Sequence, residues 1–301
     1  DYELFRLNAG KTLGIGNYDS ANIIHSNGKF YLLVGTSTSN RDHFYIVDAK
    51  TLYYENSAVV GANLSGLTIL NEQYGLVTGD GIRRIDLKSL NNVRIKNERL
   101  LCFYNSIIYN GKVLSNDTYK DESKVKYYDV NELIAAKEGE APAVTELDII
   151  QKQKINFVLA KDGNVYTLES ADDGCNIVKI KNDFTLEKVF ANFQPAKGPY
   201  HSSPTIGMVA SETENIIYLV STDGAIFKYI LGDSDSLKAP FIAAESGVSI
   251  TAPLQLNQQS GELYVTYTEE RKDESKIVVY SKDGKVLHTI DCGESVPSQI
   301  L

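Results

Sequence analysis

The side chains that most often do chemistry are few in this sequence, and they form no catalytic or metal-binding pattern. The four histidines and three cysteines are His25, His43, His201, His288, Cys102, Cys175 and Cys292. The histidines lack the spacing of a metal-binding pair. The cysteines lack the Cys-x-x-Cys spacing of a zinc or redox site, so we expect at most one disulfide. The sequence contains no nucleophile elbow, P-loop or HExxH motif. We therefore expect no catalytic residue, no metal and no cofactor.

One loop has a composition suited to binding rather than to catalysis. It spans residues 192–203 and carries Tyr200 and His201 between Pro199 and Pro204. A rigid loop with aromatic and polar side chains loses little conformational entropy when it contacts a ligand. An ordinary long surface loop has the same composition, so both interpretations stay open.

A repeated phrase defines the elements that must position these side chains. A turn, commonly with glycine, is followed by an alternating apolar strand, and this phrase occurs six times. The copies begin at Asn27, Asn71, Asn110, Asp162, Glu214 and Ser260. A period of about 40–50 residues made only of short strands is typical of a β-propeller. We therefore predict an all-β propeller of four-stranded blades, with six repeats visible.

A second phrase follows the first at a fixed interval. A strand ends in an acidic residue, and a turn and a leucine come next, as at Asp48, Asp86 and Asp129. Aspartate at the first position of a tight turn accepts hydrogen bonds from backbone groups two residues further on. We interpret these aspartates as turn formers rather than as catalytic carboxylates.

The two phrases together predict where the strands and the chain ends lie. In the first repeat we expect strands at 21–26, 29–35, 42–48 and 52–60. Six such units fit between residues 21 and 291, and both ends of the chain remain strand-like. Propellers close by pairing such ends, which removes exposed sheet edges. We predict one domain, 1–301, closed in this way, with seven blades favoured and six the alternative; the only helix-like stretch is 131–137.

The layout places the candidate binding residues on one face, around the entrances of the inner strands. These entrances are mostly neutral: Asn22, Ser65, Asn105, Asn156, Thr205, Thr251 and Ser298. A hard cation needs several oxygen ligands with charge among them, so the set favours a neutral, polar ligand over a metal. The predicted ligand-binding residues are Tyr200, His201, Arg41, Tyr119, Arg271, Asn105 and Asn156.

Composition excludes two classes of partner. The formal net charge is −9, and nucleic-acid binding requires a basic surface. No apolar run approaches the ~20 residues of a membrane-spanning helix. The chain begins with Asp1 rather than Met, which we interpret as an exported protein that has lost its signal peptide; a trimmed chain would begin in the same way.

Several segments resemble the YncE-like propellers. These are residues 20–31, the later Tyr45-Ile46-Val47-Asp48 and the final 283–290. More narrowly, the chain resembles secreted, lipid-anchored members of gut anaerobes, some of which capture cobalamin beside a TonB-dependent transporter. The resemblance implies seven blades, an outer-membrane surface or periplasmic location, and no enzymatic activity. It also implies membrane contact only through a lipid anchor absent from this chain.

Three functional hypotheses follow. The first is a non-catalytic binding propeller that captures a small, cobalamin-like nutrient for an outer-membrane transporter. The second is a protein–protein scaffold without a small ligand. The third is a lactonase-type hydrolase, which would need a metal over the central channel; the neutral residues at the inner-strand entrances disfavour it.

Overall fold

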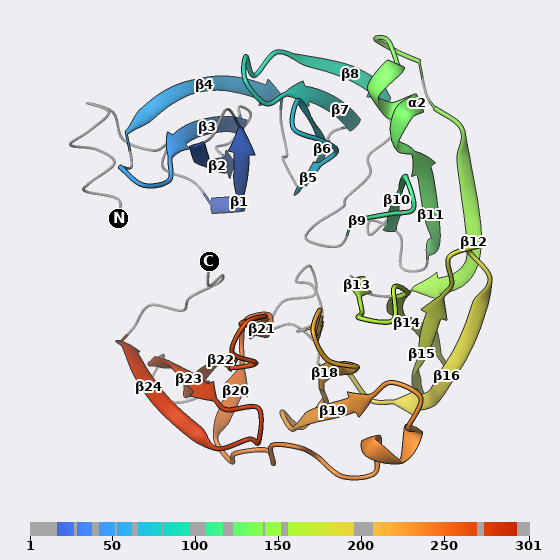
Figure 1. Cartoon of the computed structure of the whole chain (residues 1–301), viewed down its shortest axis with the longest axis vertical. Coiled ribbons are helices and arrows are strands. Elements are labelled where there is room, and N and C mark those ends of the chain that lie inside the picture. The colour runs from blue at the N-terminus through green and yellow to red at the C-terminus, as the bar shows by residue number, and fades with distance from the viewer. Residues whose placement is uncertain are drawn as a thin grey trace. The chain divides into compact units, whose positions relative to one another are not determined.

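The computed structural model describes most of the chain as short strands. The described residues are 17–26, 29–37, 42–51, 53–61, 66–79, 81–96, 106–116, 123–140, 142–151, 156–195, 207–269 and 274–293. They fall into two compact units, Asp1–Asp148 and Ile149–Leu301. Within each unit the strands form successive antiparallel sheets, each built from consecutive segments of the chain (Figure 1).

The first unit holds three sheets. The first sheet is β1 (Asn17–Ser26), β2 (Lys29–Ser37), β3 (Asp42–Asp48) and β4 (Tyr54–Gly61). The second is β5 (Gly66–Ile69), β6 (Tyr74–Gly79), β7 (Gly81–Asp86) and β8 (Asn92–Lys96). The third is β9 (Ile107–Tyr109), β10 (Lys112–Asn116), β11 (Ser123–Asp129) and β12 (Val144–Gln151). Strand β12 crosses the boundary into the second unit.

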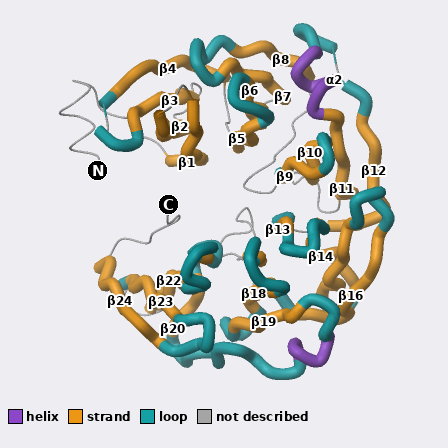
Figure 2. The backbone as a smooth tube through the Cα atoms, viewed as in Figure 1, coloured by secondary structure: helices purple, strands orange, loops and turns teal. Residues whose placement is uncertain are grey.

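The second unit repeats the plan with small variations. Its first sheet is β13 (Val158–Leu159), β14 (Val165–Ala171), β15 (Gly174–Ile180) and β16 (Leu186–Phe193). Its second is β17 (Met208–Ala210), β18 (Ile216–Val220) and β19 (Ile226–Ile230), followed by the short 3₁₀-helix η1 (Ser234–Leu237). Its third is β20 (Val248–Ile250), β21 (Gln255–Leu256), β22 (Leu263–Glu269), β23 (Ser275–Tyr280) and β24 (Val286–Gly293). Short turns link the neighbouring strands of the β13–β16 sheet, whereas helix α2 (Val130–Ala135) lies between β11 and β12 (Figure 2).

The repeat phrases predicted these strands well. The four strands expected in the first repeat correspond to β1–β4, with differences of one to four residues at their ends. The third sheet contains the one α-helix of the described residues, α2 (Val130–Ala135), where residues 131–137 looked helical. The terminal segments expected to close the propeller lie outside the described residues. Closure of a single domain and the number of blades therefore stay predictions.

The turn aspartates do what their spacing predicted. The Asp48 carboxylate accepts hydrogen bonds from the backbone N–H groups of residues 50 and 51. Asp86 accepts from residues 88 and 89 in the same way. Asp129 accepts from residues 131 and 132 and so caps helix α2. Each aspartate satisfies backbone donors at a chain reversal, which confirms the interpretation of turn chemistry.

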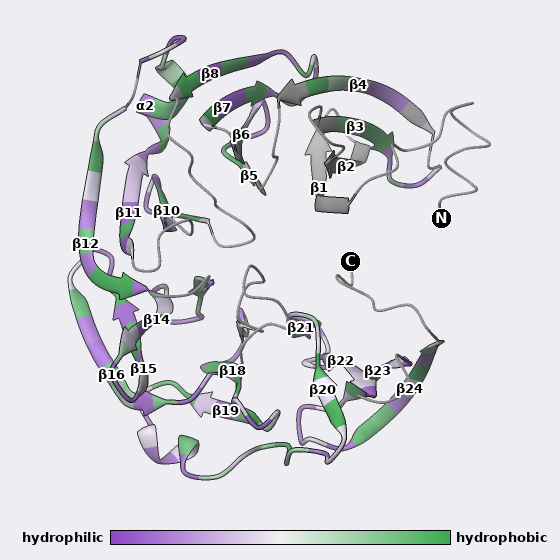
Figure 3. Ribbon diagram, turned by 180° about the vertical axis from the view of Figure 1, so that it is seen from behind, coloured by the Kyte–Doolittle hydropathy of each residue, from purple (hydrophilic) through white to green (hydrophobic). Residues whose placement is uncertain are grey.

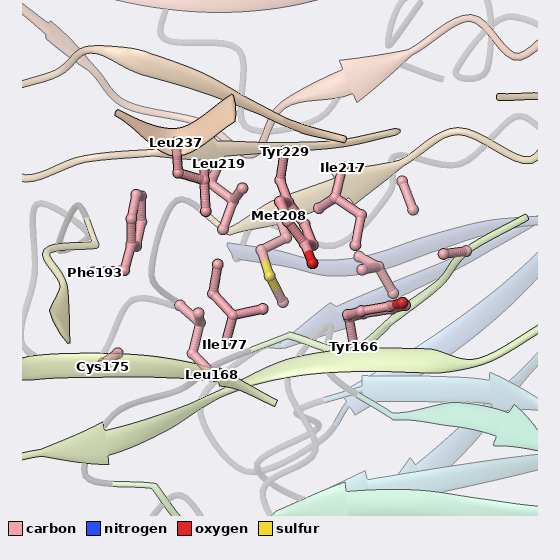
Figure 4. Packing of buried hydrophobic residues seen from close by; sticks show 13 residues of the cluster. Tyr166, Leu168, Cys175, Ile177, Phe193, Met208, Ile217, Leu219, Tyr229 and Leu237 are labelled. Carbon is pink, nitrogen blue, oxygen red and sulfur yellow. The ribbon is translucent and has the colours of Figure 1, made fainter. Parts of the chain in front are cut away.

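The core lies between neighbouring sheets of a unit. Residues 165–168 of β14 are all at most 2% exposed, although successive side chains of a strand point to opposite faces. Strand β14 is therefore covered on both faces along these four residues. Between the first two sheets of the second unit, Leu168 and Ile177 face Leu219 and Tyr229 (Figure 4). Met208 fills the space between these layers, as its flexible side chain allows.

The outer strands have a different character. Strand β24 is exposed along nearly its whole length, and Val286, Leu287 and Ile290 are 58%, 44% and 50% exposed. Polar and apolar stretches follow each other along the outer strands β12 and β16 (Figure 3). His288, also on β24, is exposed, because its strand has no further strand paired to it among the described residues.

Cys175 is buried and Cys292 is partly buried, while Cys102 lies outside the described residues. Among the described helices, none has the length and apolar character needed to cross a bilayer.

Candidate functional site

Six of the seven predicted ligand-binding residues lie outside the described part of the chain. They are Tyr200, His201, Arg41, Tyr119, Arg271 and Asn105. Their ligand contacts stay predictions. Asn156 is the member of the set that the structure describes.

The Asn156 side chain joins two sheets of the second unit. Its amide nitrogen donates to the Met208 carbonyl oxygen at 2.7 Å, and its amide oxygen accepts from the Met208 N–H at 3.0 Å. The Asn156 carbonyl oxygen accepts from the Thr167 hydroxyl at 3.1 Å. The side chain thus ties the entrance of β13 to β17. Ligand binding by Asn156 stays a prediction, and its amide already has this structural role.

Other neutral residues near the inner strands are also paired within the protein. The Thr251 hydroxyl lies 2.9 Å from the Thr268 hydroxyl, and the Thr68 hydroxyl is hydrogen-bonded to Ser106. Buried polar groups need partners because desolvation without a hydrogen bond is costly. A free hydrogen-bonding group in a recess therefore stands out.

A small hollow lies at the turn ends of the last two sheets of the second unit. Its volume is about 130 Å³. The lining residues are Ser211, Thr213, Glu214, Tyr218, Leu256, Gln259, Ser260, Gly261 and Lys282. They come from the β17–β18 turn, strand β18, strand β21, the β21–β22 turn and the β23–β24 turn. We call this set of residues the Tyr218 hollow.

Tyr218 is the aromatic residue among those that line the hollow, and its hydroxyl has no partner among the described residues. Tyr218 is 2% exposed and packs against Phe241, with ring centroids 5.6 Å apart. The ammonium of Lys228, directly opposite on β19, lies 5.9 Å from the Tyr218 ring centroid and 5.0 Å from that of Phe241. It donates to the Lys282 carbonyl at 3.1 Å and not to the Tyr218 hydroxyl.

The preceding sheet contains the same pair in a closed form. There Tyr166 lies opposite Lys179, whose ammonium is 5.8 Å from the Tyr166 ring centroid. The Tyr166 hydroxyl donates to the Asp162 carboxylate at 2.9 Å, and the Lys179 ammonium lies 2.9 Å from the same oxygen. Glu214 occupies the position of Asp162 in the repeat, but no hydrogen bond joins it to Tyr218 among the described residues. At Tyr166 the carboxylate of Asp162 bonds both the tyrosine hydroxyl and the lysine ammonium, whereas the Tyr218 hydroxyl bonds neither Glu214 nor Lys228.

Electrostatics distinguish the two sites as well. Burial raises the pKa of Asp162, but the hydrogen bonds from Lys179, Asn164 and Tyr166 outweigh it and leave the pKa below its usual value. Burial, with smaller contributions from Glu214 and Asp283, raises the pKa of Tyr218 to about 12. Tyr218 is therefore neutral at physiological pH and can both donate and accept a hydrogen bond.

The described residues contain no group of three or more histidine, cysteine, aspartate or glutamate side chains arranged to hold a metal. The Asp-Ser-Asp-Ser run at 233–236 instead begins η1, where the Asp233 carboxylate caps the turn by accepting from the Asp235 N–H. Within the Tyr218 hollow no histidine accompanies the serine hydroxyls. The Ser211 hydroxyl accepts hydrogen bonds from the backbone N–H groups of Thr213 and Glu214.

Sequence reasoning missed this hollow, although the signal was present. The repeat phrase contains a tyrosine four residues after its first residue at Asp162-Tyr166, Glu214-Tyr218 and Ser260-Tyr264. We used the phrase only to locate strands. The first residue of the phrase is Asp162 before Tyr166 but Glu214 before Tyr218, and this change marks the sheet in which the tyrosine hydroxyl has no partner among the described residues.

Comparisons with known proteins identify the family and the fold. A family model described as a domain of unknown function (DUF5074) matches residues 4–295. No curated protein matches the sequence. A crystal structure of a quinonprotein alcohol dehydrogenase-like protein from Bacteroides thetaiotaomicron is 99% identical, with a TM-score of 0.88 over 96% of this chain and 70% of that chain.

More distant structures share the fold alone. A functionally unknown protein from Desulfotomaculum acetoxidans is 13% identical, with a TM-score of 0.57 over 96% of this chain and 89% of that chain. A catalytically inactive virginiamycin B lyase from Staphylococcus aureus with quinupristin is 13% identical, with a TM-score of 0.53 over 96% and 90%. The structural neighbours are β-propellers, and the predicted fold class is confirmed.

Proposed function

This chain belongs to the family described as a domain of unknown function (DUF5074), and we propose that it is a non-catalytic binding β-propeller for small polar molecules. The observation that supports this function is the Tyr218 hydroxyl, which has no hydrogen-bond partner among the described residues although its side chain is largely buried at the hollow. The Tyr218 hydroxyl is not one of the fully buried polar atoms that lack a partner, so it is open to the hollow, where water or a ligand can bond to it. Such a group in a recess is typical of a binding site.

The chemistry of the hollow favours binding over catalysis. The lining offers one carboxylate, at Glu214, and no histidine. Nucleophilic catalysis requires a base within hydrogen-bonding distance of the nucleophile, and hydrolysis by paired carboxylates requires a second acid. Hydrogen-bonding side chains with balanced charge can hold a ligand without changing it.

The finer proposal is capture of a cobalamin-like nutrient for an outer-membrane transporter, by a protein located at the outer-membrane surface or in the periplasm. The resemblance to YncE-like propellers of gut anaerobes supports it. In this proposal Tyr200 and His201 contact the nutrient. The segment that carries them precedes β17 in the chain, and the Tyr218 hollow follows β17.

Calorimetric titration with cyanocobalamin and cobinamide tests this function, alongside the change in melting temperature. A ligand at 100 times its dissociation constant adds about 2.7 kcal/mol to the free energy of unfolding. We expect a clear shift for the unmodified chain and a smaller one for Tyr200→Ala and His201→Ala. Binding that both variants retain would move the nutrient site elsewhere. If no cobalamin binds, the nutrient proposal is wrong.

The exposed apolar side chains of β24 favour a second candidate, a protein–protein scaffold. Val286, Leu287 and Ile290 project from an outer strand that has no further strand paired to it among the described residues. Such a surface is typical of a protein contact. Capture of an outer-membrane protein by the unmodified chain, and its loss with Leu287→Glu and Ile290→Glu, would support this candidate. Equal capture by the variant would count against it.

A further inference from the structure

The deepest group of the Tyr218 hollow is neutral. The Tyr218 residue is 2% exposed, and its hydroxyl lacks a hydrogen-bond partner among the described residues. The equivalent hydroxyl of Tyr166 is paired with Asp162. The difference is therefore local to this hollow and does not follow from the repeat. A ligand group that reaches Tyr218 must be able to hydrogen-bond to a neutral phenol.

Charges of both signs lie near Tyr218, so neither a lone anion nor a lone cation is favoured at this depth. Glu214 and Asp283 act on the Tyr218 phenol, where their negative charge would repel a carboxylate or phosphate. The Lys228 ammonium lies against the Tyr218 ring, where it would repel a cationic group. Inside a protein such repulsion is stronger than in water, because the effective dielectric constant is lower. A neutral hydroxyl meets neither penalty.

The rim of the hollow adds several neutral hydrogen-bonding groups. The Gln259 amide and the Ser260 hydroxyl lie on the exposed β21–β22 turn, and Thr213 lies on the facing turn. Leu256 and the edge of Tyr218 supply apolar surface. A volume of about 130 Å³ corresponds to on the order of four water molecules. A ligand must therefore be small or must insert only one ring edge.

We propose that the Tyr218 hollow binds a neutral, polyhydroxylated ligand, one sugar ring or an equivalent polyol, with the Tyr218 hydroxyl as its deepest contact. Adjacent ring hydroxyls both donate and accept, which matches the phenol at depth and the amide and hydroxyls at the rim. The apolar edge of the ring packs on Leu256. This inference rests on the proposed binding function and names the ligand class for the hollow.

The test is binding of a panel of neutral monosaccharides, measured by saturation-transfer NMR and calorimetry on the full chain. We expect at least one hexose to bind with a dissociation constant on the order of 1 mM. Tyr218→Phe removes only the hydroxyl and should weaken binding at least tenfold. Tyr166→Phe, the matched control in the neighbouring sheet, should leave the affinity unchanged. Gln259→Ala, on an exposed turn, should weaken binding without affecting folding.

Further binding experiments distinguish a free sugar from the end of a glycan and test other ligand classes. Equal affinity for a free hexose and for an oligosaccharide that ends in it would identify the ring alone as the ligand, and tighter oligosaccharide binding would identify a glycan end. Binding of glycine or serine in place of sugars would overturn the neutral class. Sugar binding that Tyr218→Phe and Gln259→Ala both retain would place the site elsewhere. Cobalamin binding without sugar binding would refute this inference and leave the proposed function standing; binding of neither would refute both.

Discussion

Removing one oxygen atom from Tyr166 and from Tyr218 should have very different effects on stability. The Tyr166 hydroxyl donates to the Asp162 carboxylate at 2.9 Å, and hydrogen bonds to charged groups contribute about 1.5–3 kcal/mol. Asp162 keeps its contacts with Lys179 and the Asn164 N–H when the hydroxyl is gone, so we expect Tyr166→Phe to cost about 2 kcal/mol. The Tyr218 hydroxyl has no partner among the described residues. Tyr218→Phe should therefore change the free energy of unfolding by less than about 0.5 kcal/mol.

Equilibrium unfolding in urea, with calorimetric melting as a second probe, measures this difference. A loss of about 2 kcal/mol in a unit of some 150 residues should lower the melting temperature by roughly 4–8 °C. The two variants differ from the unmodified chain by the same atom, so the comparison cancels effects of the unfolded state. Equal destabilisation by both substitutions would refute the reasoning, because it would mean that the Tyr218 hydroxyl also has a strong partner in the protein.

Three further predictions concern pH, packing and backbone geometry. Burial raises the pKa values of Tyr166, Tyr218 and Tyr267, so the folded state holds protons that the unfolded state releases near pH 10. The contribution of these tyrosines to the free energy of unfolding is complete below pH 10 and is lost as the pH rises. For Tyr218, whose pKa in the folded state is about 12, the loss is about 3 kcal/mol. Equilibrium unfolding between pH 9 and 12 measures it. Ile177→Ala, at a fully buried position between two sheets, should cost about 2–5 kcal/mol in urea unfolding, and a cost near zero would contradict the packing. Gly174→Ala should destabilise by more than about 1 kcal/mol, because the glycine has φ 128° and a Cβ would lie 2.6 Å from a backbone carbonyl oxygen; an unchanged melting temperature would disprove this.

Local sequence was sufficient for the strands and turns. Asp48, Asp86 and Asp129 bond backbone groups only two or three residues away, so their role depends on nothing distant. The alternation within each repeat sets which residues face a neighbouring sheet. Strand ends were less predictable, as with β1, which begins at Asn17 rather than residue 21, because pairing with β2 extends it.

The candidate site depended on contacts that the sequence does not display. Asn156 is a predicted ligand contact, which stays a prediction, and its amide also bonds Met208, 52 residues further on. The choice between a structural and a binding role for such a side chain depends on whether a backbone partner lies within reach. Only the packing of β13 beside β17 determines that.

The sequence by itself determined the repeat, the all-β class, the turn chemistry and the acidic balance, because these follow from neighbouring residues and composition. The tertiary structure decided which tyrosine of the repeat is satisfied and which is open. Tyr166 and Tyr218 occupy the same repeat position, with a lysine opposite each. Asp162 bonds the Tyr166 hydroxyl, whereas Lys228 is directed to the Lys282 carbonyl of the next sheet and the Tyr218 hydroxyl is left open. The change from Asp162 to Glu214 is visible in the sequence, but the direction of Lys228 depends on a contact between sheets that the local sequence does not show.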